Sequence, residues 1–273
     1  MTWPHGARLA AAIVLYLEFW EMTSASDGVR DPRFDDAMGR YEPDYRSYTW
    51  REYGNRVGIF RILELLDRLN LPVTVAAGSA ALARYPQLVA ALRDRGYCFA
   101  AHGRASNEMV SSRMTKADEL ALIKGAMEAV TRAAGRPVRG WVAQDFGESA
   151  NTPELAAQAG CDWLFDWPND DQPYPMTVSR PLISIPNQAE WDDVQAMYHR
   201  RLPPPTFAAA VTEAFDRLHA ESGRFFSLQL HPWIAGVPHR FRCVERALEH
   251  IASRPLVWWA TLDEVADHVL AAA

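Results

Sequence analysis

Short apolar runs alternate with stretches of helical spacing along nearly the whole chain, and this alternation constrains the fold more than any other feature of the sequence. The first run, RLAAAIVLYL at 8–17, predicts an unbroken apolar strand. A helix is predicted for YGNRVGIFRILELLDRLN at 53–70, and a second strand for LPVTVAA at 71–77. Apolar strands that alternate with helices are typical of parallel βαβ units.

The same alternation continues toward the C-terminus. Further helices are predicted at 85–96, 115–135, 152–160, 206–223 and 241–254, and further strands at 97–102, 138–143, 161–167, 182–186, 225–231 and 256–261. No linker or change of composition interrupts the pattern. About seven such units therefore predict a single α/β domain over 1–273, arranged as a parallel barrel.

One segment does not follow the alternation. Residues 23–50 are polar, aromatic and rich in turn residues, without a helical or strand period. A long irregular segment inside a compact chain is usually functional, so this segment is predicted to contribute to function.

Charge and composition exclude several classes of partner. The net charge is −6, with 28 Lys and Arg against 34 Asp and Glu, which gives no basic surface for nucleic acid or anionic lipid. No apolar stretch approaches the roughly 20 residues of a membrane span. The apolar run at 9–20 contains Glu18 and lacks a clean cleavage site, and the three cysteines lie far apart. We therefore expect a cytoplasmic protein whose partner is a small molecule.

Polar side chains stand where the predicted strands end. In parallel barrels the loops at the carboxyl ends of the strands converge, and the chemistry takes place there. In LYLEFWEM, at 15–22, the carboxylate of Glu18 comes directly after the first apolar run. The candidates collected at these ends are Glu18, Glu21, His102, Trp141, Asp145, Asp166, Asp170, Asp171, Glu190 and His231.

Longer motifs point to a known family. The segments REYGNRVGIFRILELL, AHGR, NDDQPYP, LISIPNQAEWDD and HPWIAGVPHRFR occur in this order along the chain. With these motifs the chain resembles the polysaccharide deacetylase superfamily, and in particular its branch of metal-independent allantoinases and cyclic imide hydrolases. The resemblance implies a distorted parallel (β/α)7-type barrel in one domain.

The sequence departs from the superfamily at the metal-binding positions. In the metal-dependent members, an aspartate base is followed by an aspartate ligand after strand one, and a His-x-x-x-His pair follows strand three. Here Glu18 and Phe19 hold the first two places, and His102 and Ser106 hold the second two. Two of the three protein ligands are therefore missing, and one imidazole fixes a divalent ion too weakly for catalysis. We expect no metal and no other cofactor.

The resemblance also implies roles for the groups that remain. Glu18 takes the place of the general base, and His231 is expected to protonate a leaving nitrogen or to stabilise an oxyanion. His102 is assigned to the catalytic set, with a purely structural role as the alternative. Burial among tryptophans is expected to raise the pKa of Glu18 toward neutrality. A salt-bridged carboxylate at a strand end is the alternative interpretation of Glu18.

A second set of residues is assigned to substrate binding. It consists of Trp20, Arg56, Trp141, Asp170, Asp171, Gln172, Glu190 and Trp233. The acidic loop that contains Asp170 and Asp171 can equally be a solvated turn between prolines.

The functional expectation is a metal-independent hydrolase that opens a C–N bond of a small cyclic amide, imide or ureide. A metal-dependent N-deacetylase of an acetylated sugar, using Glu18, His102 and Asp145, is one alternative. A non-catalytic small-molecule binding protein on the same barrel is another. A homo-oligomer, dimer or tetramer, is expected because the aromatic segment 34–50 is too apolar in places for a monomer's surface.

Overall fold

The strands form one curled sheet at the centre of the molecule. The computed structural model describes residues 1–23 and 43–272. The strands are β1 (Leu9–Leu17), β2 (Val73–Ala77), β3 (Cys98–Ala101), β4 (Gly140–Trp141), β5 (Trp163–Leu164), β6 (Tyr174–Pro175), β7 (Ile183–Ser184), β8 (Arg224–Leu230) and β9 (Val257–Trp259). Their order is β6-β7-β5-β4-β3-β2-β1-β8, and all neighbours are parallel except β6 and β7. β9 lies beside the first three residues of β1, and β2 lies beside the last five.

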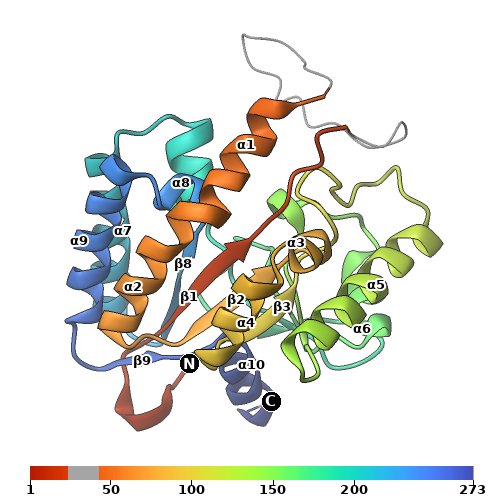
Figure 1. Ribbon diagram of the computed structural model, residues 1–273. Coiled ribbons are helices and arrows are strands. Elements are labelled where there is room, and N and C mark those ends of the chain that lie inside the picture. The colour runs from red at the N-terminus through yellow and green to blue at the C-terminus, as the bar shows by residue number, and fades with distance from the viewer. Residues whose placement is uncertain (24–42, 273) are drawn as a thin grey trace.

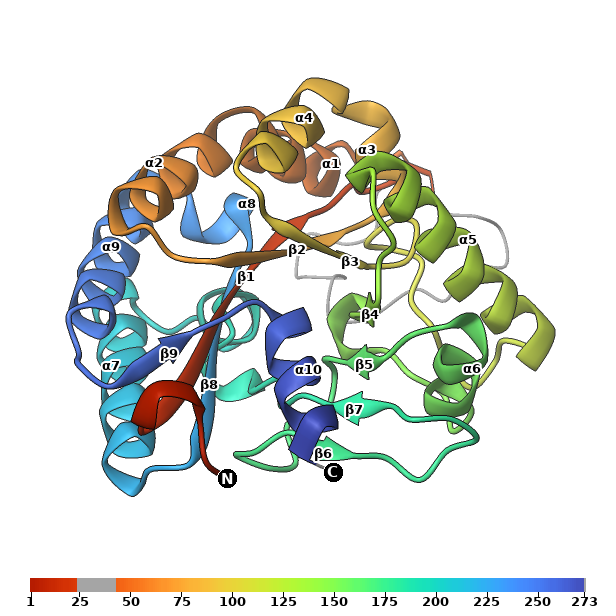
Figure 2. The ribbon, with the colours of Figure 1, turned by 90° about the horizontal axis from the view of Figure 1, so that it is seen from below.

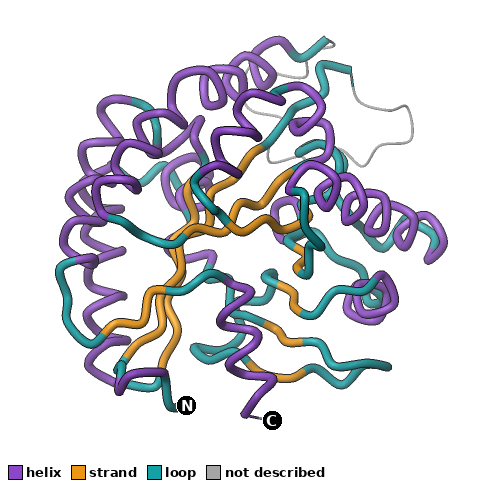
Figure 3. The backbone as a smooth tube through the Cα atoms, turned by 60° about the horizontal axis from the view of Figure 1, so that its bottom comes forward, coloured by secondary structure: helices purple, strands orange, loops and turns teal. Residues whose placement is uncertain are grey.

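Helices surround the outside of this sheet, as Figures 1 and 2 show. The helices are α1 (Tyr45–Tyr53), α2 (Ile59–Leu69), α3 (Ser79–Arg84), α4 (Pro86–Asp94), α5 (Lys116–Ala134), α6 (Thr152–Ala159), α7 (Pro204–Glu221), α8 (Pro232–Ala235), α9 (Pro238–Ala252) and α10 (Leu262–Ala272), of which α10 lies at one end of the barrel and not around its outside. The tube in Figure 3 shows the strands as an inner layer and most helices as an outer one. The predicted (β/α)7-type barrel is confirmed.

The side chains of β1 divide the core into two parts. Ala10, Ala12, Val14 and Tyr16 belong to an inner cluster, whereas the alternate residues from Leu9 to Leu17 belong to the cluster beneath the helices. Successive side chains of a strand point to opposite faces, so the inward series continues from Tyr16 to Glu18. The strand period therefore directs Glu18 into the carboxyl end of the barrel.

Helix α10 closes the opposite end. Its residues Leu262, Val265, Ala266 and Val269 are buried in the same inner cluster as Ala10. The sequence predicted no element for this segment, which follows the last predicted strand. The long inner strand is thus covered by a helix at its amino end and carries Glu18 just beyond its carboxyl end.

Each predicted helix and strand has a counterpart in the structure, but some differ in extent, and α3, α8, α10 and β6 were not predicted. The strands predicted at 138–143 and 161–167 are only two residues long, since little of each run forms a ladder. The segment 23–50 was predicted to be irregular, but α1 already begins at Tyr45, where the side chain of Asp44 accepts a hydrogen bond from the backbone of Ser47. The helix was missed because its polar and aromatic residues show no apolar stripe. Residues 24–42 of this segment lie outside the described residues.

Two further expectations concern the environment of the protein. Within 1–23 and 43–272, no helix combines the length and the apolar character that a membrane crossing requires. The prediction of a homo-oligomer stays a prediction, as does the cytoplasmic location.

Two glycines allow the helical segment after α1 to touch α8. Gly54–Gly58 forms a π-helical turn between α1 and α2. A Cβ atom on Gly54 would lie 2.6 Å from the backbone nitrogen of Trp233, and one on Gly58 would collide with the carbonyl oxygen of Pro232. This close approach brings the residues at the end of α1 to the loop that follows β8.

We predict that Gly58→Ala destabilises the protein by about 1–3 kcal/mol, because the added methyl group meets backbone atoms rather than a flexible side chain. The matched control is Gly125→Ala in α5, where a Cβ atom meets nothing within 4 Å. That variant should gain up to about 1 kcal/mol, since alanine is the better helix former. Urea unfolding of both variants measures the difference, and equal stabilities would contradict the packing described above.

Candidate active site

A small pocket opens at the carboxyl end of the barrel, around the end of β1. Among its lining residues are Glu18, Arg51, His102, Ser106, His231 and Trp233, and its volume is about 30 Å³. We call it the Glu18 pocket. These residues come from the ends of β1, β3 and β8 and from α1, α8 and the loop after β3. The pocket therefore unites all three residues that the sequence assigned to catalysis.

Glu18 is fixed through both carboxylate oxygens. The hydroxyl of Ser106 donates to Oε1 at 3.0 Å, and the indole Nε1 of Trp233 donates to Oε2 at 2.9 Å. The side-chain amide of Asn55 donates to the backbone carbonyl of Glu18 at 2.7 Å. Only 9% of the residue is exposed. The carboxylate is therefore buried, oriented and hydrogen-bonded before any ligand arrives.

A buried arginine provides the nearest permanent positive charge to this carboxylate among the lining residues. The guanidinium carbon of Arg51 lies 3.9 Å from the ring centroid of Trp233 and 4.3 Å from that of Trp20. Stacking between two indoles stabilises a desolvated guanidinium. The sequence assigned Arg56 to substrate binding, and in the structure Arg56 is exposed and does not line the pocket. Arg51 was not selected from the sequence, because the helix α1 that contains it was not predicted.

The charges around Glu18 reverse the expected effect of burial. Burial alone would raise the pKa of Glu18, but the neighbouring imidazole of His102 and the positive charges of His231 and Arg51 act against it. The net result holds the pKa of Glu18 well below its ordinary value. The prediction of a raised pKa is therefore wrong, because it considered the tryptophans and missed the cations.

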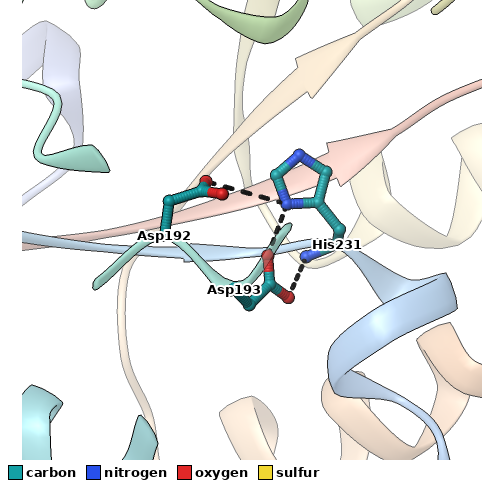
Figure 4. A group of neighbouring side chains, drawn as sticks. All are labelled: Asp192, Asp193 and His231. Carbon is teal, nitrogen blue, oxygen red and sulfur yellow. Dashed lines mark hydrogen bonds and ion pairs between the residues drawn. The ribbon is translucent and has the colours of Figure 1, made fainter. Parts of the chain in front are cut away.

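His231 is paired with a carboxylate that the sequence did not single out. Its Nδ1 lies 2.6 Å from Oδ1 of Asp193, and its backbone N–H donates to Oδ2 at 2.9 Å. Figure 4 shows both contacts, with Asp192 beside them and the second ring nitrogen pointing away from the carboxylates. The ring of Tyr16 stacks on the imidazole at a centroid distance of 3.8 Å. This arrangement fixes the ring and leaves Nε2 available.

Asp193 decides the charge of His231. Burial by itself would lower the pKa of the imidazole, but the charge and hydrogen bond of Asp193 outweigh it and raise the pKa of His231 to about 9. At neutral pH, His231 is therefore a buried cation that can give up a proton. Asp193 is the last residue of the sequence motif EWDD. No spacing in the chain indicates its role, because only the fold brings it to His231.

His102 is held by its backbone neighbours. Its Nδ1 lies 2.9 Å from the carbonyl oxygen of Val142, and because a carbonyl only accepts, Nδ1 carries the hydrogen. The side-chain amide of Gln144 donates to the carbonyl of His102 at 2.6 Å. Nε2 then lies 3.7 Å from Oε1 of Glu18. The imidazole thus presents its second nitrogen to the carboxylate of the candidate base.

Several residues assigned to substrate binding lie elsewhere. Gln172 donates to the carbonyl of Gly223 at 2.7 Å, and Phe225 donates to the carbonyl of Asp171 at 2.8 Å. Both contacts are at the start of β8, whereas His231 follows its end. Neither these residues nor Asp170 lines the Glu18 pocket. The acidic loop belongs to the barrel's amino end, and its assignment to the substrate is not supported.

Of the other residues assigned to substrate binding, some lie at or near the Glu18 pocket and others lie away from it. Glu190 forms an exposed ion pair with Arg200 and does not line the pocket. Trp141 is completely buried and lies outside the lining, and Trp20 contributes through its stack on Arg51. Trp233 lines the pocket directly. Of the tryptophans selected from the sequence, Trp233 alone reaches the pocket surface in the described part of the chain.

Comparisons with known proteins identify relatives of the whole barrel. No family model matches the chain. A Schizosaccharomyces pombe protein assigned as a polysaccharide deacetylase is 29% identical over 240 residues, which cover 79% of this chain and 73% of that protein. A peptidoglycan deacetylase of Helicobacter pylori is 25% identical over 252 residues, covering 80% of this chain and 85% of that protein.

Solved structures give the same result over nearly the full length. The PuuE allantoinase is 25% identical with a TM-score of 0.87, covering 98% of this chain and 92% of that one. A structure assigned as a polysaccharide deacetylase of Pseudomonas aeruginosa is 26% identical with a TM-score of 0.85, covering 97% and 92%. The resemblance to the polysaccharide deacetylase superfamily is confirmed.

The positions that hold the metal in this superfamily are brought together in the fold, but their side chains are not ligands. The backbone N–H of Ser106 donates to the carbonyl of Phe19 at 2.8 Å, so both positions lie beside His102 and Glu18. Phe19 has no ligand atom, and the hydroxyl of Ser106 is committed to Glu18. The residues at this place do not fit the superfamily's metal.

One other group of side chains contains residue types that bind metals. Within the described residues, Asp192, Asp193 and His231 are the only three His, Cys, Asp or Glu side chains whose ligand atoms lie within 4.8 Å of one another. The 2.6 Å between Nδ1 of His231 and Asp193 is a hydrogen-bond distance. Two ligands bound at about 2.0–2.2 Å to one tetrahedral ion lie further apart than this. His231 and Asp193 are therefore a hydrogen-bonded pair and not two ligands of one ion.

We predict that Asp193→Asn lowers the pKa of His231 from about 9 toward or below its ordinary value of 6.5. The amide removes the negative charge while burial remains. A raised histidine pKa stabilises the fold fully below pH 6.5, and this stabilisation is lost as the pH rises through about 9. The variant should lose that dependence. Imidazole titration by NMR measures the pKa, with Asp192→Asn as control because Asp192 lies 4.0 Å from the ring. Equal effects of the two variants would contradict the pairing.

Proposed function

We propose that the protein is a metal-independent hydrolase that opens a C–N bond of a small cyclic amide, imide or ureide. The observation that carries the proposal is the presence of an ionised Glu18 and a protonated His231 in one pocket whose superfamily metal positions carry Phe19 and Ser106. The pKa shifts keep both groups in these states from mildly acidic pH to about pH 9.

The first step uses two acceptors that face one another. Oε1 of Glu18 and the unprotonated Nε2 of His102 are 3.7 Å apart, too far for a direct hydrogen bond. A water that donates one hydrogen to each would be oriented with its lone pair free. Glu18 takes one proton as the water oxygen bonds to the substrate carbonyl carbon, and the carbonyl electron pair moves onto oxygen.

Two pocket residues can stabilise the resulting oxyanion. The guanidinium of Arg51 is a fixed positive charge, and Tyr16 lines the same pocket. Burial and the nearby carboxylates, Asp192 foremost, raise the pKa of Tyr16 far above its ordinary value. The phenol therefore stays a hydrogen-bond donor. Preorganised donors of this kind take the part that a Lewis acid plays in the metal-dependent enzymes.

The second step uses His231. When the oxyanion collapses, the C–N bond breaks and the leaving nitrogen takes the proton from Nε2 of His231. Asp193 holds the opposite nitrogen and favours the charged ring until that moment. The product is one open-chain molecule. It carries a carboxylic acid at one end and, at the former ring nitrogen, an amine, amide or urea, depending on the substrate. Return of the proton from Glu18 to His231 through solvent restores the pocket.

The nature of the electrophile follows from what the pocket lacks. An acetamide on a sugar is a weak electrophile, and the metal-dependent enzymes polarise its carbonyl with a cation. A cyclic imide or ureide has a second activating carbonyl or ring strain, so it needs less help. This chemistry supports a cyclic substrate.

A metal-dependent sugar deacetylase is the second candidate, favoured by the names of the relatives from Schizosaccharomyces pombe and Helicobacter pylori. It would require Glu18, His102 and Asp145 as ligands. In the described part of the chain these three do not form a close ligand group, and Asp145 accepts a hydrogen bond from Gln195 at 2.7 Å. A binding protein without activity is the third possibility, and turnover of any substrate excludes it.

We predict that Glu18→Gln lowers the rate per folded molecule by about 10² to 10⁴, because the amide cannot accept the proton from water. The variant should also melt at a lower temperature. A depressed pKa means that the folded state stabilises the carboxylate above its ordinary pKa of 4.5, and the substitution removes that contribution. The rate must therefore be divided by the folded fraction measured on the same sample.

The control for this variant is Ser106→Ala, which removes one hydrogen bond to Glu18 and leaves the carboxylate. It should share part of the stability loss and retain far more of the rate. If Glu18→Gln kept the wild-type rate per folded molecule, Glu18 would be a structural carboxylate.

We predict that the purified protein hydrolyses at least one member of a panel containing hydantoin, succinimide, glutarimide, phthalimide, dihydrouracil and allantoin, with unchanged rate in the presence of a chelator. Elemental analysis should find no stoichiometric zinc, cobalt or nickel. Acetylated chitin and peptidoglycan oligomers are the comparison substrates. Turnover of these oligomers alone, abolished by chelator and restored by metal, would replace the proposal by the deacetylase.

A further inference from the structure

An aromatic groove lies beside the Glu18 pocket and shares one wall with it. Among its lining residues are Trp50, Tyr198, Trp233, Val237, His239 and Arg240, and its volume is about 350 Å³. Trp233 lines both spaces, and its indole nitrogen donates to Oε2 of Glu18. We propose that this groove binds a flat apolar substituent of the substrate that ends in a carboxylate. The inference deepens the proposed function and rests on it for the identity of the reacting ring.

The sizes of the two spaces support a second site for the substituent of the substrate. A volume of about 30 Å³ holds about two water molecules. This is room for the attacking water and the reacting carbonyl, and not for a substituted ring. The groove is more than ten times larger. A substrate whose carbonyl enters the Glu18 pocket therefore leaves most of its atoms outside it. The groove is the neighbouring space that can hold them, because Trp233 lines both.

Three aromatic rings give the groove its shape. Trp50 and Trp233 are nearly parallel, with an interplanar angle of 17° and a centroid distance of 6.2 Å. Tyr198 meets both of them edge to face, at 5.8 Å from Trp50 and 5.3 Å from Trp233. Ile234 and Val237 add aliphatic surface. Walls of this kind favour a flat ring over a flexible sugar chain.

The only charged side chains in the lining of the groove and of an adjoining cavity, among the described residues, are the arginines Arg240 and Arg201. Arg240 and His239 line it, and both also line an adjoining cavity of about 450 Å³ together with His199 and Arg201. None of the described lining residues of either space is acidic. In a chain with a net charge of −6, this is a local excess of positive charge.

Arg240 is the residue that selects the carboxylate in this proposal. It is half-buried, and no hydrogen bond or ion pair joins its side chain to another residue of the described chain. Burial lowers the pKa of its guanidinium, against the weaker opposite effect of Asp193. A partly desolvated guanidinium beside an apolar groove binds a carboxylate through two parallel hydrogen bonds.

The test is calorimetric titration with 4-phenylbenzoate and with its neutral amide, 4-phenylbenzamide. Neither compound contains a cyclic amide, so binding is independent of turnover. The wild-type protein should bind the carboxylate about tenfold or more tighter than the amide. Arg240→Gln should remove this preference. The matched control is Arg242→Gln, an exposed arginine of the same helix α9 that lines neither space and should keep it.

Each outcome bears on the inference. Equal binding of the two compounds to the wild-type protein, which needs no variant to fold, overturns it. So does an equal loss of preference in Arg240→Gln and Arg242→Gln. Trp50→Ala should weaken both compounds by a similar factor, and unchanged binding of both would also contradict the groove.

The substrate itself separates this inference from the proposed function. N-(4-carboxyphenyl)succinimide should be hydrolysed with a kcat/KM about tenfold or more above that of N-phenylsuccinimide, and Arg240→Gln should bring the two together. Hydrolysis of simple rings without this difference retains the hydrolase and removes the groove. Selective binding of 4-phenylbenzoate without hydrolysis of any ring retains the groove as a binding site and removes the hydrolase.

Discussion

A carboxylate buried at the end of an apolar strand is costly, and the arrangement of the pocket follows from how that cost is met. Desolvation of Glu18 disfavours its charge. Ser106 and Trp233 donate to it from the loop after β3 and from α8, and Arg51 approaches from α1. These segments are far apart in sequence. The contacts that stabilise one buried charge therefore join α1, α8 and the loop after β3 at the end of β1.

The same electrostatics bear on the proposal that this pocket works without an ion. A divalent cation both attracts the carboxylates and polarises the carbonyl. Here the positive charge is divided between Arg51 and protonated His231, and the latter is maintained by Asp193. Fixed cations on side chains polarise less strongly than a metal at short range. Under the proposed function, this division of charge suits a carbonyl that is already activated.

The ends of the strands could be predicted from the sequence, because the apolar runs mark the strands. In parallel barrels the active site lies at their carboxyl ends, whatever the details of packing. Glu18, His102 and His231 were found in this way. Arg51 was missed because its helix has no apolar stripe, and Asp193 was missed because its contact with His231 depends on how the segment after β7 crosses β8. The loop 170–172 was misplaced because the chain beyond β5 has returned to the amino end of the barrel by this point, where the loop contacts the start of β8. Such contacts depend on the path of the chain rather than on local pattern.

Glu18 and the two altered metal positions have different mechanical support. Glu18 continues the inward series of β1, a strand that pairs with β2, β8 and β9, whereas Phe19 and Ser106 lie in the connections beyond β1 and β3. Substitutions at the two loop positions need not disturb the ladder that places the base. The barrel thus allows the residues at the two superfamily metal positions to change independently of the base, because separate segments support them.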